Sequence, residues 1–263
     1  MGSGVVGLRC DDHAMDRDKL LSRWRAAYAE PTSGWDFSTI DAVVDGEPPW
    51  SYEVLARRAL AGATSALDMG TGGGEMLSTL RDAVPDDTVA TEGWPSNIPV
   101  AKTALAPFGV EVVPYDSEND LRMPFSDGRF DVVLNRHESF VTTEVFRVLR
   151  PGGVFLTQQV DGRDFAQSQA LFGGSASYPH ITLQRLHAEA EEAGFIVDES
   201  DDWSGTMRFP DVASFVSYVR VVPWQVPDDF SVDRYSEVHL KLTPTDLVFT
   251  QRRFMMMGRR PRQ

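Results

Sequence analysis

Four glycines within five residues follow a short apolar run near residue 70, and this segment constrains the fold more than any other. The apolar run is Ala66-Leu67-Asp68-Met69, the turn is Gly70-Thr71-Gly72-Gly73-Gly74, and Glu75 opens a helical pattern. Glycine accepts positive φ and lets backbone approach a ligand closely, so such a turn can present its amides above a strand end. The segment therefore predicts an α/β fold with a ligand-binding turn after its first strand.

Short apolar runs alternate with helical patterns from residue 62 onward, which is typical of a parallel sheet. Parallel strands are predicted at residues 65–69, 88–92, 110–113, 130–135 and 154–160. Helices are predicted from about residue 75, from residue 96, and over residues 142–149 and 182–193. With further strands at 195–198 and 247–257, we expect a Rossmann-like, seven-stranded, mainly parallel sheet with helices on both faces.

The first 61 residues predict helices and show no strand pattern. A helix over residues 16–30 stops at Pro31, and Ser51 can cap a second helix. Residues 208–243 resemble a helical insertion before the last strand. We therefore expect an N-terminal helical cap, residues 1–61, and a core of residues 62–263 that carries this insertion.

The charge balance bears on the kind of partner. The chain has a formal net charge of -14, so its surface field should repel the phosphates of a nucleic acid, and a small molecule is favoured. The arginines near the C-terminus could form either a solvated tail or a phosphate-binding edge; they are Arg252, Arg253, Arg259, Arg260 and Arg262.

The sequence offers few signals for metals, disulfides or membranes. Cys10 is the single cysteine, so neither an intrachain disulfide nor a cysteine-based metal cluster is expected. No run approaches the ~18 apolar residues of a membrane span, and no export signal is apparent. We expect a cytoplasmic protein without a metal, and the oligomeric state is not predicted.

The spacing of the glycines separates two classes of ligand. A dinucleotide fingerprint needs glycine at the sixth position of G-x-G-x-x-G, where this chain has Glu75, so a nicotinamide-dependent enzyme is disfavoured. At the end of the second strand, Glu92 could accept hydrogen bonds from ribose hydroxyls. Trp94 could pack against an adenine face or belong to the core.

Four blocks in order resemble the class I S-adenosylmethionine-dependent methyltransferase family over residues 65–159, and more loosely to the end. They are the glycine turn, Glu92, the segments Tyr115-Asp116-Ser117 and 123–133, and the run 144–153 that ends in Leu149-Arg150-Pro151-Gly152-Gly153. The resemblance implies S-adenosylmethionine as cofactor. It implies that Gly70, Gly72 and Gly74 line the methionine end.

The same resemblance assigns the remaining cofactor contacts. Glu92 would hold the ribose, Asp116 would meet the adenine amino group, and Asn135 would lie against the cofactor. Thr71, Trp94 and Ser117 adjoin these positions and complete the predicted cofactor-binding set, whereas Asp131 matches a position that is usually structural.

The absence of two motifs narrows the class of methyl-transfer reaction that the chain can catalyse. After the fourth strand the chain has Asn135-Arg136-His137-Glu138 rather than the Pro-Pro-Tyr run of adenine-specific DNA enzymes, and Cys10 is too remote to attack a pyrimidine. We expect methyl transfer to a small-molecule acceptor at an O, N or C atom. An RNA methyltransferase and a non-catalytic S-adenosylmethionine-binding protein remain as alternatives.

Two candidate catalytic residues follow the fourth strand. His137 with Glu138 could act as a general base, or the histidine could orient the loop that carries Asn135. Aromatic residues outside the parallel core could roof an acceptor pocket or pack in a core; they are Trp24, Trp35, Phe215, Tyr218 and Trp224.

Overall fold

A computed structural model describes residues 10–31, 37–242 and 245–262, and the side chains from residue 17 onward within those ranges. The chain forms two compact units. The core unit comprises Gly46–Asp164, Tyr178–Gly205 and Gln251–Gln263. The second unit comprises Met1–Asp45, Phe165–Ser177 and Thr206–Thr250. Trp35 lies outside the described residues.

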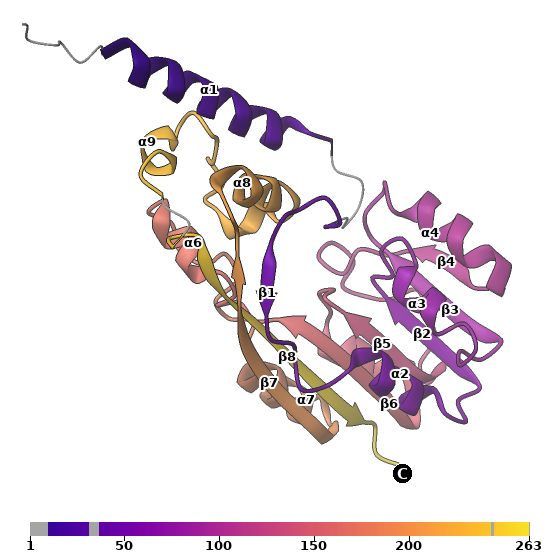
Figure 1. The fold of residues 1–263 in the computed structure, drawn as a ribbon. Coiled ribbons are helices and arrows are strands. Elements are labelled where there is room, and N and C mark those ends of the chain that lie inside the picture. Colours follow the sequence, from indigo (N-terminus) through magenta and orange to yellow (C-terminus); the bar gives the residue numbers. More distant parts are fainter. Residues whose placement is uncertain (1–9, 32–36, 243–244, 263) are drawn as a thin grey trace, which may run out of the picture. The chain divides into compact units, whose positions relative to one another are not determined.

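Five strands of the core unit run parallel in the spatial order β4, β3, β2, β5, β6 (Figure 1). They are β2 Ser65–Met69, β3 Asp87–Glu92, β4 Glu111–Pro114, β5 Phe130–Arg136 and β6 Leu149–Val160. The chain moves outward from β2 through β4 and then returns to the other side of β2 at β5. This reversal between β2 and β5 is the switch point at which open α/β sheets bind ligands. It confirms the predicted Rossmann-like arrangement.

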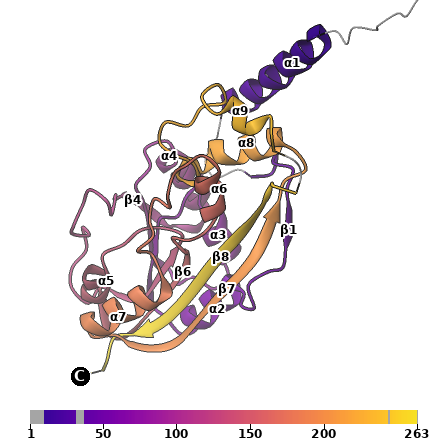
Figure 2. The ribbon, with the colours of Figure 1, turned by 90° about the vertical axis from the view of Figure 1, so that its left-hand side faces the viewer.

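The sheet continues beyond β6 with β8, Val248–Arg259, which is antiparallel to β6, and then with β7, Ile196–Arg208. Figure 2 shows β7 and β8 side by side. The short strand β1, Val43–Asp45, pairs with Thr206–Arg208 at the end of β7. The described residues therefore form eight strands, and the predicted count of seven is wrong. All three β1 residues are exposed, so they lack the alternating burial that produces a strand signal.

Helices cover both faces of the core sheet, as predicted. The core helices are α2 Tyr52–Leu60, α3 Glu75–Thr79, α4 Ile98–Leu105, α5 Thr142–Val148 and α7 Leu183–Ala193, with a 3₁₀ turn at Ala106–Phe108. Ala66 clusters with Leu55 of α2, and the next strand residue, Leu67, clusters with Leu186 of α7. Because successive strand residues point to opposite faces, α2 and α7 lie on opposite sides.

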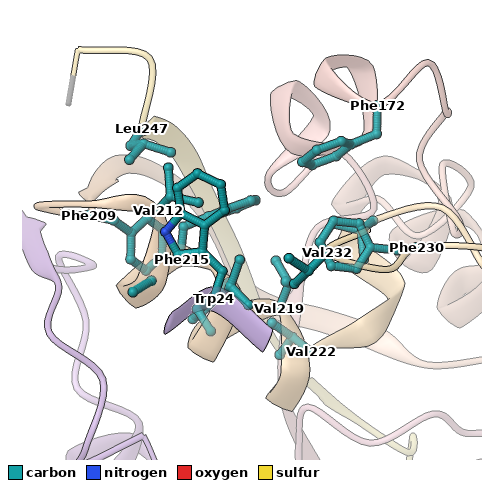
Figure 3. Close-up of a cluster of buried hydrophobic side chains, with 14 of the residues drawn as sticks. Trp24, Phe172, Phe209, Val212, Phe215, Val219, Val222, Phe230, Val232 and Leu247 are labelled. Carbon is teal, nitrogen blue, oxygen red and sulfur yellow. The ribbon is translucent and has the colours of Figure 1, made fainter. Parts of the chain in front are cut away.

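The second unit has a core of its own. Its helices are α1 Cys10–Ala29, α6 Ala166–Leu171, α8 Val212–Val221 and α9 Ser236–His239, with a 3₁₀ turn at Pro223–Gln225. Asp211 caps α8 because its side chain accepts a hydrogen bond from the backbone N–H of Ser214. Trp24 of α1 is 4% exposed and belongs to the cluster that contains Phe215 and Val219 of α8 (Figure 3). This packing joins α1 to the unit.

Candidate functional site

The carboxyl ends of three neighbouring strands bring the predicted site residues to one edge of the core sheet. Met69 of β2 pairs with Asn135 of β5, and Asn135 pairs in turn with Thr157 of β6. On the other side of β2, Glu92 closes β3. The glycine turn, Glu92 and Asn135 therefore share the edge where parallel sheets carry their binding sites.

Hydrogen bonds to the end of β3 fix the glycine turn. The backbone N–H of Thr71 donates to the carbonyl of Thr91 over 2.9 Å. Gly70, Gly72 and Gly74 have φ values of 64°, 63° and 89°, a region that glycine enters without strain. The glycines therefore serve the shape of the turn as well as its access to a ligand.

Glu92 joins the turn to β3 through its carboxylate. Its Oε2 accepts a hydrogen bond from the N–H of Gly72 at 2.7 Å, and its Oε1 accepts one from the N–H of Trp94 at 2.8 Å. Burial raises the pKa of Glu92, and these backbone donors oppose the rise. A carboxylate has about four lone-pair sites, so two bonds leave it able to accept more.

Trp94 does not belong to the core, since 56% of its surface is exposed. The core alternative for this residue is therefore wrong. The preceding Gly93 has a steric role: a Cβ there would lie 3.0 Å from the Cα of Asp116. The close approach of the loops after β3 and β4 thus explains the glycine that follows Glu92.

Asp116 and Ser117 lie in the loop after β4. The carboxylate of Asp116 accepts hydrogen bonds from the Nδ2 of Asn119 at 2.6 Å and from the backbone N–H of Glu118 at 3.0 Å. The amide of Asn119 and that backbone donor lower the pKa of Asp116. Ser117 is buried, and its Oγ lies 3.1 Å from the Oε1 of Glu138. Ser117 thus connects this loop to the loop after β5.

Asn135 is fully buried and has an unused donor. Its Oδ1 accepts hydrogen bonds from the Nε2 of Gln159 at 2.6 Å and from the Oγ1 of Thr157 at 3.0 Å. Within the described residues, its Nδ2 has no hydrogen-bond partner. Because a buried donor without a partner is costly, this amide is suited to a ligand atom or a water molecule.

Glu138 lies against the glycine turn. A Cβ built on Gly70 would fall 2.4 Å from the Cβ of Glu138, so the two residues are in direct contact. Burial, reinforced by the charges of Glu92, Asp116 and Glu118, raises the pKa of Glu138 to about 7. A carboxyl group with such a pKa exchanges its proton near neutrality.

His137 precedes Glu138 at the same edge. It is exposed and has a φ of 63°, in the left-handed region that residues other than glycine seldom adopt. Its backbone N–H donates to the carbonyl of Gln158 over 2.8 Å, which ties the loop to β6. Of the two candidate catalytic residues, Glu138 therefore lies against the glycine turn, and His137 is held by Gln158 of β6.

Asp68 is a site residue that sequence reasoning missed. It is 7% exposed within β2, directly before the turn, and burial raises its pKa to about 7. The signal in the sequence was a carboxylate inside an otherwise apolar strand, because a charge in that position needs compensation. Asp131, in contrast, is structural as expected: its Oδ2 accepts a hydrogen bond from the N–H of Thr64 at 2.7 Å.

The aromatic residues proposed as a pocket roof pack within the second unit. Trp24, Phe215 and Tyr218 are buried in its hydrophobic cluster, and Trp224 packs against that cluster. For these four residues, core packing is therefore the correct alternative.

The C-terminal arginines make protein contacts. Arg253 pairs with Asp164 at 2.6 Å, and Arg259 pairs with Asp198 at 3.4 Å. Arg260 donates to the carbonyl of Leu149 at 2.7 Å. Most of the run belongs to β8, so it is not a solvated tail.

The described residues offer neither a cluster of metal ligands nor a membrane-spanning helix. Within residues 10–31, 37–242 and 245–262, no group of three or more His, Cys, Asp or Glu side chains could hold a metal ion. In the same part of the chain, no helix has the length and apolar character needed to cross a membrane.

The glycine turn follows the first parallel strand, and Glu92 closes the second. Both lie at the strand reversal, where open α/β sheets bind ligands. Residues 67–157 match the family described as "Methyltransferase domain". The match confirms the resemblance predicted from the sequence. Residues 67–157 therefore form a methyltransferase domain of the class I type.

One curated relative is the ubiquinone/menaquinone biosynthesis C-methyltransferase UbiE of Desulfotalea psychrophila. It is 31% identical over 112 residues, which are 40% of this chain and 44% of the relative. The chain thus aligns with less than half the length of that protein.

Solved structures share the fold. A candidate methyltransferase of Bacillus halodurans C-125 superposes with a TM-score of 0.59 at 21% identity, covering 80% of this chain and 99% of the other. A functionally unknown protein of Deinococcus radiodurans R1 gives a TM-score of 0.58 at 15% identity, covering 94% and 99%. These similarities confirm the α/β fold and extend it beyond the family match.

Proposed function

We propose that the protein transfers a methyl group from S-adenosylmethionine to a small-molecule acceptor. The observation that carries this proposal is the link between Glu92 and Gly72, over 2.7 Å. It holds an acidic side chain against the glycine turn at the strand reversal, where a nucleoside with two ribose hydroxyls needs an acceptor.

The residues present fit this cofactor. Glu92 keeps lone pairs beyond the two used by backbone donors, and Asn135 has a buried amide donor without a partner among the described residues. Glycines at positions 70, 72 and 74 leave backbone rather than side chains at the turn. When bound, S-adenosylmethionine supplies an electrophilic methyl group.

In this proposal the chain's own residues bind and orient the two partners. Glu92 holds the ribose, Asp116 and Ser117 lie toward the adenine, and Trp94 supplies an exposed indole beside it. Gly70, Thr71, Gly72 and Gly74 lie along the methionine end, together with Asn135. Methyl transfer from a sulfonium depends mainly on such positioning, so a strong general base is not required.

A phenolic or quinol acceptor is the first class to test, and the transferred methyl is then expected on carbon. Support comes from the relative named as a C-methyltransferase of quinone biosynthesis, which is 31% identical over 112 residues. The net charge of -14 argues against RNA, whose phosphates the surface would repel.

Calorimetric titration tests the cofactor half of the proposal. S-adenosylmethionine and S-adenosylhomocysteine are expected to bind, and nicotinamide dinucleotides are not. A panel of small phenols, quinols and amines, assayed by mass spectrometry for a gain of one methyl group, tests the second half. Tight cofactor binding without turnover on any acceptor would favour the non-catalytic alternative.

A further inference from the structure

A chain of hydrogen bonds connects His137 to a tryptophan far away in sequence. The indole Nε1 of Trp50 donates to the Oε1 of Gln158 over 2.8 Å. The Nε2 of the same glutamine lies 3.1 Å from the Nε2 of His137. Gln158 belongs to β6 and is 7% exposed, so its amide is held inside the core unit.

The chemistry of these groups fixes the direction of every bond. An indole N–H can only donate, so the oxygen of the Gln158 amide must face Trp50. The NH₂ of that amide then faces His137 and can only donate. The Nε2 of His137 must therefore accept, which requires a lone pair on Nε2 and, in a neutral ring, a proton on Nδ1.

The surroundings favour this neutral ring. Although the residue as a whole is exposed, its imidazole lies against the buried Gln158. Loss of hydration of this ring and the positive charges of Arg253 and Arg136 hold the pKa of His137 below its ordinary value. The lone pair on Nε2 is already used by Gln158, and Nδ1 carries a proton. His137 in this form has no free lone pair with which to take a proton from a substrate.

The backbone of His137 shows that its position is maintained at a cost. A φ of 63° is unfavourable for histidine by roughly 1–2 kcal/mol, and such strain is concentrated at functional sites. The hydrogen bond from its N–H to the carbonyl of Gln158 holds that conformation. One glutamine thus fixes both the backbone and the ring of an exposed residue at the ligand edge.

We propose that His137 is a hydrogen-bond donor to the methyl acceptor, through Nδ1–H, and that Gln158 and Trp50 are the positioning residues that set its tautomer. The acceptor it recognises carries a phenolate-type or carbonyl oxygen. A neutral imidazole that donates without losing its proton stabilises negative charge on such an oxygen. This inference rests on the proposed methyl transfer, because it names the acceptor class.

Nitrogen-15 NMR of the full chain, labelled at histidine, tests the tautomer without any acceptor. The signals of residue 137 are identified by their loss in His137→Ala. We expect a neutral ring with the proton on Nδ1 and no titration between about pH 5.5 and 7.5, the range of an ordinary histidine. A proton on Nε2, or titration in that range, would overturn the proposal.

Gln158→Glu replaces the hydrogen-bond donor that faces the imidazole of His137 with an acceptor. A carboxylate in that position accepts rather than donates, so the proton of His137 should move to Nε2 and the ring should begin to titrate. Trp50→Phe removes only the donor that orients the amide, and a mixture of both tautomers is expected. His187→Ala, on the exposed side of α7, is the matched control and should leave the signals of residue 137 unchanged.

Binding of a probe tests the acceptor class. With S-adenosylhomocysteine present, hydroquinone should shift the Nδ1–H signal of His137, and p-xylene, of similar shape but without oxygen, should not. Absence of a shift with hydroquinone, or equal shifts with both compounds, would overturn the assignment of an oxygen-bearing acceptor.

Kinetics then separate this inference from the proposed function. In His137→Ala, the ratio kcat/KM for an oxygen-bearing acceptor should fall about 10- to 100-fold, while the dissociation constant of S-adenosylmethionine stays within about twofold. If the unsubstituted protein does not bind S-adenosylmethionine, the methyltransferase proposal itself is refuted. Normal cofactor binding with unchanged kcat/KM in the variant would refute only the role of His137.

Discussion

The side chain of Glu138 lies directly against Gly70: a Cβ added to the glycine would fall 2.4 Å from the Cβ of Glu138 and 2.8 Å from its Oε2. Two loops that follow neighbouring strands thus meet without space for one further carbon atom. This contact brings the loop after β5 against the glycine turn after β2.

Gly70→Ala should therefore disrupt the site for two reasons, strain at a φ of 64° and collision with Glu138. The strain alone costs about 1–2 kcal/mol. Gly109→Ala measures the cost of backbone strain alone, because Gly109 has a φ of 73° and an added Cβ there would meet open space. Urea unfolding and cofactor titration should show a modest loss of stability for residue 109 and a larger loss of both properties for residue 70.

A second variant checks that the collision is the cause. Gly70→Ala combined with Glu138→Gly removes the opposing Cβ and should recover part of the stability lost in Gly70→Ala. If the combined variant is no more stable than the single one, backbone strain alone explains the effect.

Glu92→Ala should weaken S-adenosylmethionine binding by about 1.5–3 kcal/mol, the usual scale for hydrogen bonds to a charged group. The substitution also removes the acceptor for the N–H groups of Gly72 and Trp94. Glu92→Gln keeps one acceptor oxygen without the charge, so its affinity should lie between those of the alanine variant and the original chain. Calorimetry measures all three, and an unchanged affinity in folded Glu92→Ala would remove Glu92 from the ribose site.

The contribution of Asp68 to the stability of the protein should fall as pH rises from about 4 to about 7. Burial raises the pKa of Asp68 from 3.8 to about 7, so the folded state holds a proton that the unfolded chain has released. The stabilisation is complete below the unfolded pKa and is lost as pH rises through the folded one. A shift of this size corresponds to at most about 4 kcal/mol.

Asp68→Asn should flatten that slope, since the amide does not titrate. Glu138, whose pKa is raised in the same direction, should contribute what remains. Asp82→Asn is the control, because Arg57 lowers the pKa of that exposed carboxyl and its contribution is lost at acid pH instead. Urea unfolding at pH 5 and pH 8 distinguishes the two variants from each other and from the original chain, and an unaltered slope in Asp68→Asn would contradict the assignment.

Trp24→Ala should destabilise the second unit by about 3–5 kcal/mol, the usual cost of truncating a large buried aromatic side chain. Ser22→Ala, on the exposed face of the same helix, should change stability by less than about 0.5 kcal/mol. Limited proteolysis within α1 provides the measurement. Equal resistance in both variants would show that α1 does not depend on the indole.

The sequence was sufficient for the parallel strands and their ligand edge because each carries a local signal: an apolar run, a glycine turn or a closing acid. β7 extends to Arg208, well past the predicted end at residue 198. The prediction stopped too early because the later residues are mostly polar and none is buried, so they show no buried alternation. Such a strand forms through its neighbours rather than through its own composition.

In the candidate site, too, residues with a local sequence signal could be predicted and residues that depend on tertiary packing could not. Glu92 and the glycines could be placed from spacing, whereas the partners of His137 could not. Trp50 precedes Gln158 by 108 positions, and neither residue type in isolation suggests contact with a histidine. Their relation depends on how the segment before α2 packs against β6, which no local pattern expresses.

The pairing of β6 with β8 also affects how the protein is made. β6 ends at Val160, and its antiparallel partner begins only at Val248. At ordinary rates of synthesis, these about 90 intervening residues take roughly 5–20 s to emerge from the ribosome. During that interval an apolar strand has an unpaired edge, which is a template for wrong association. The nascent chain therefore depends on being shielded until its last strand arrives.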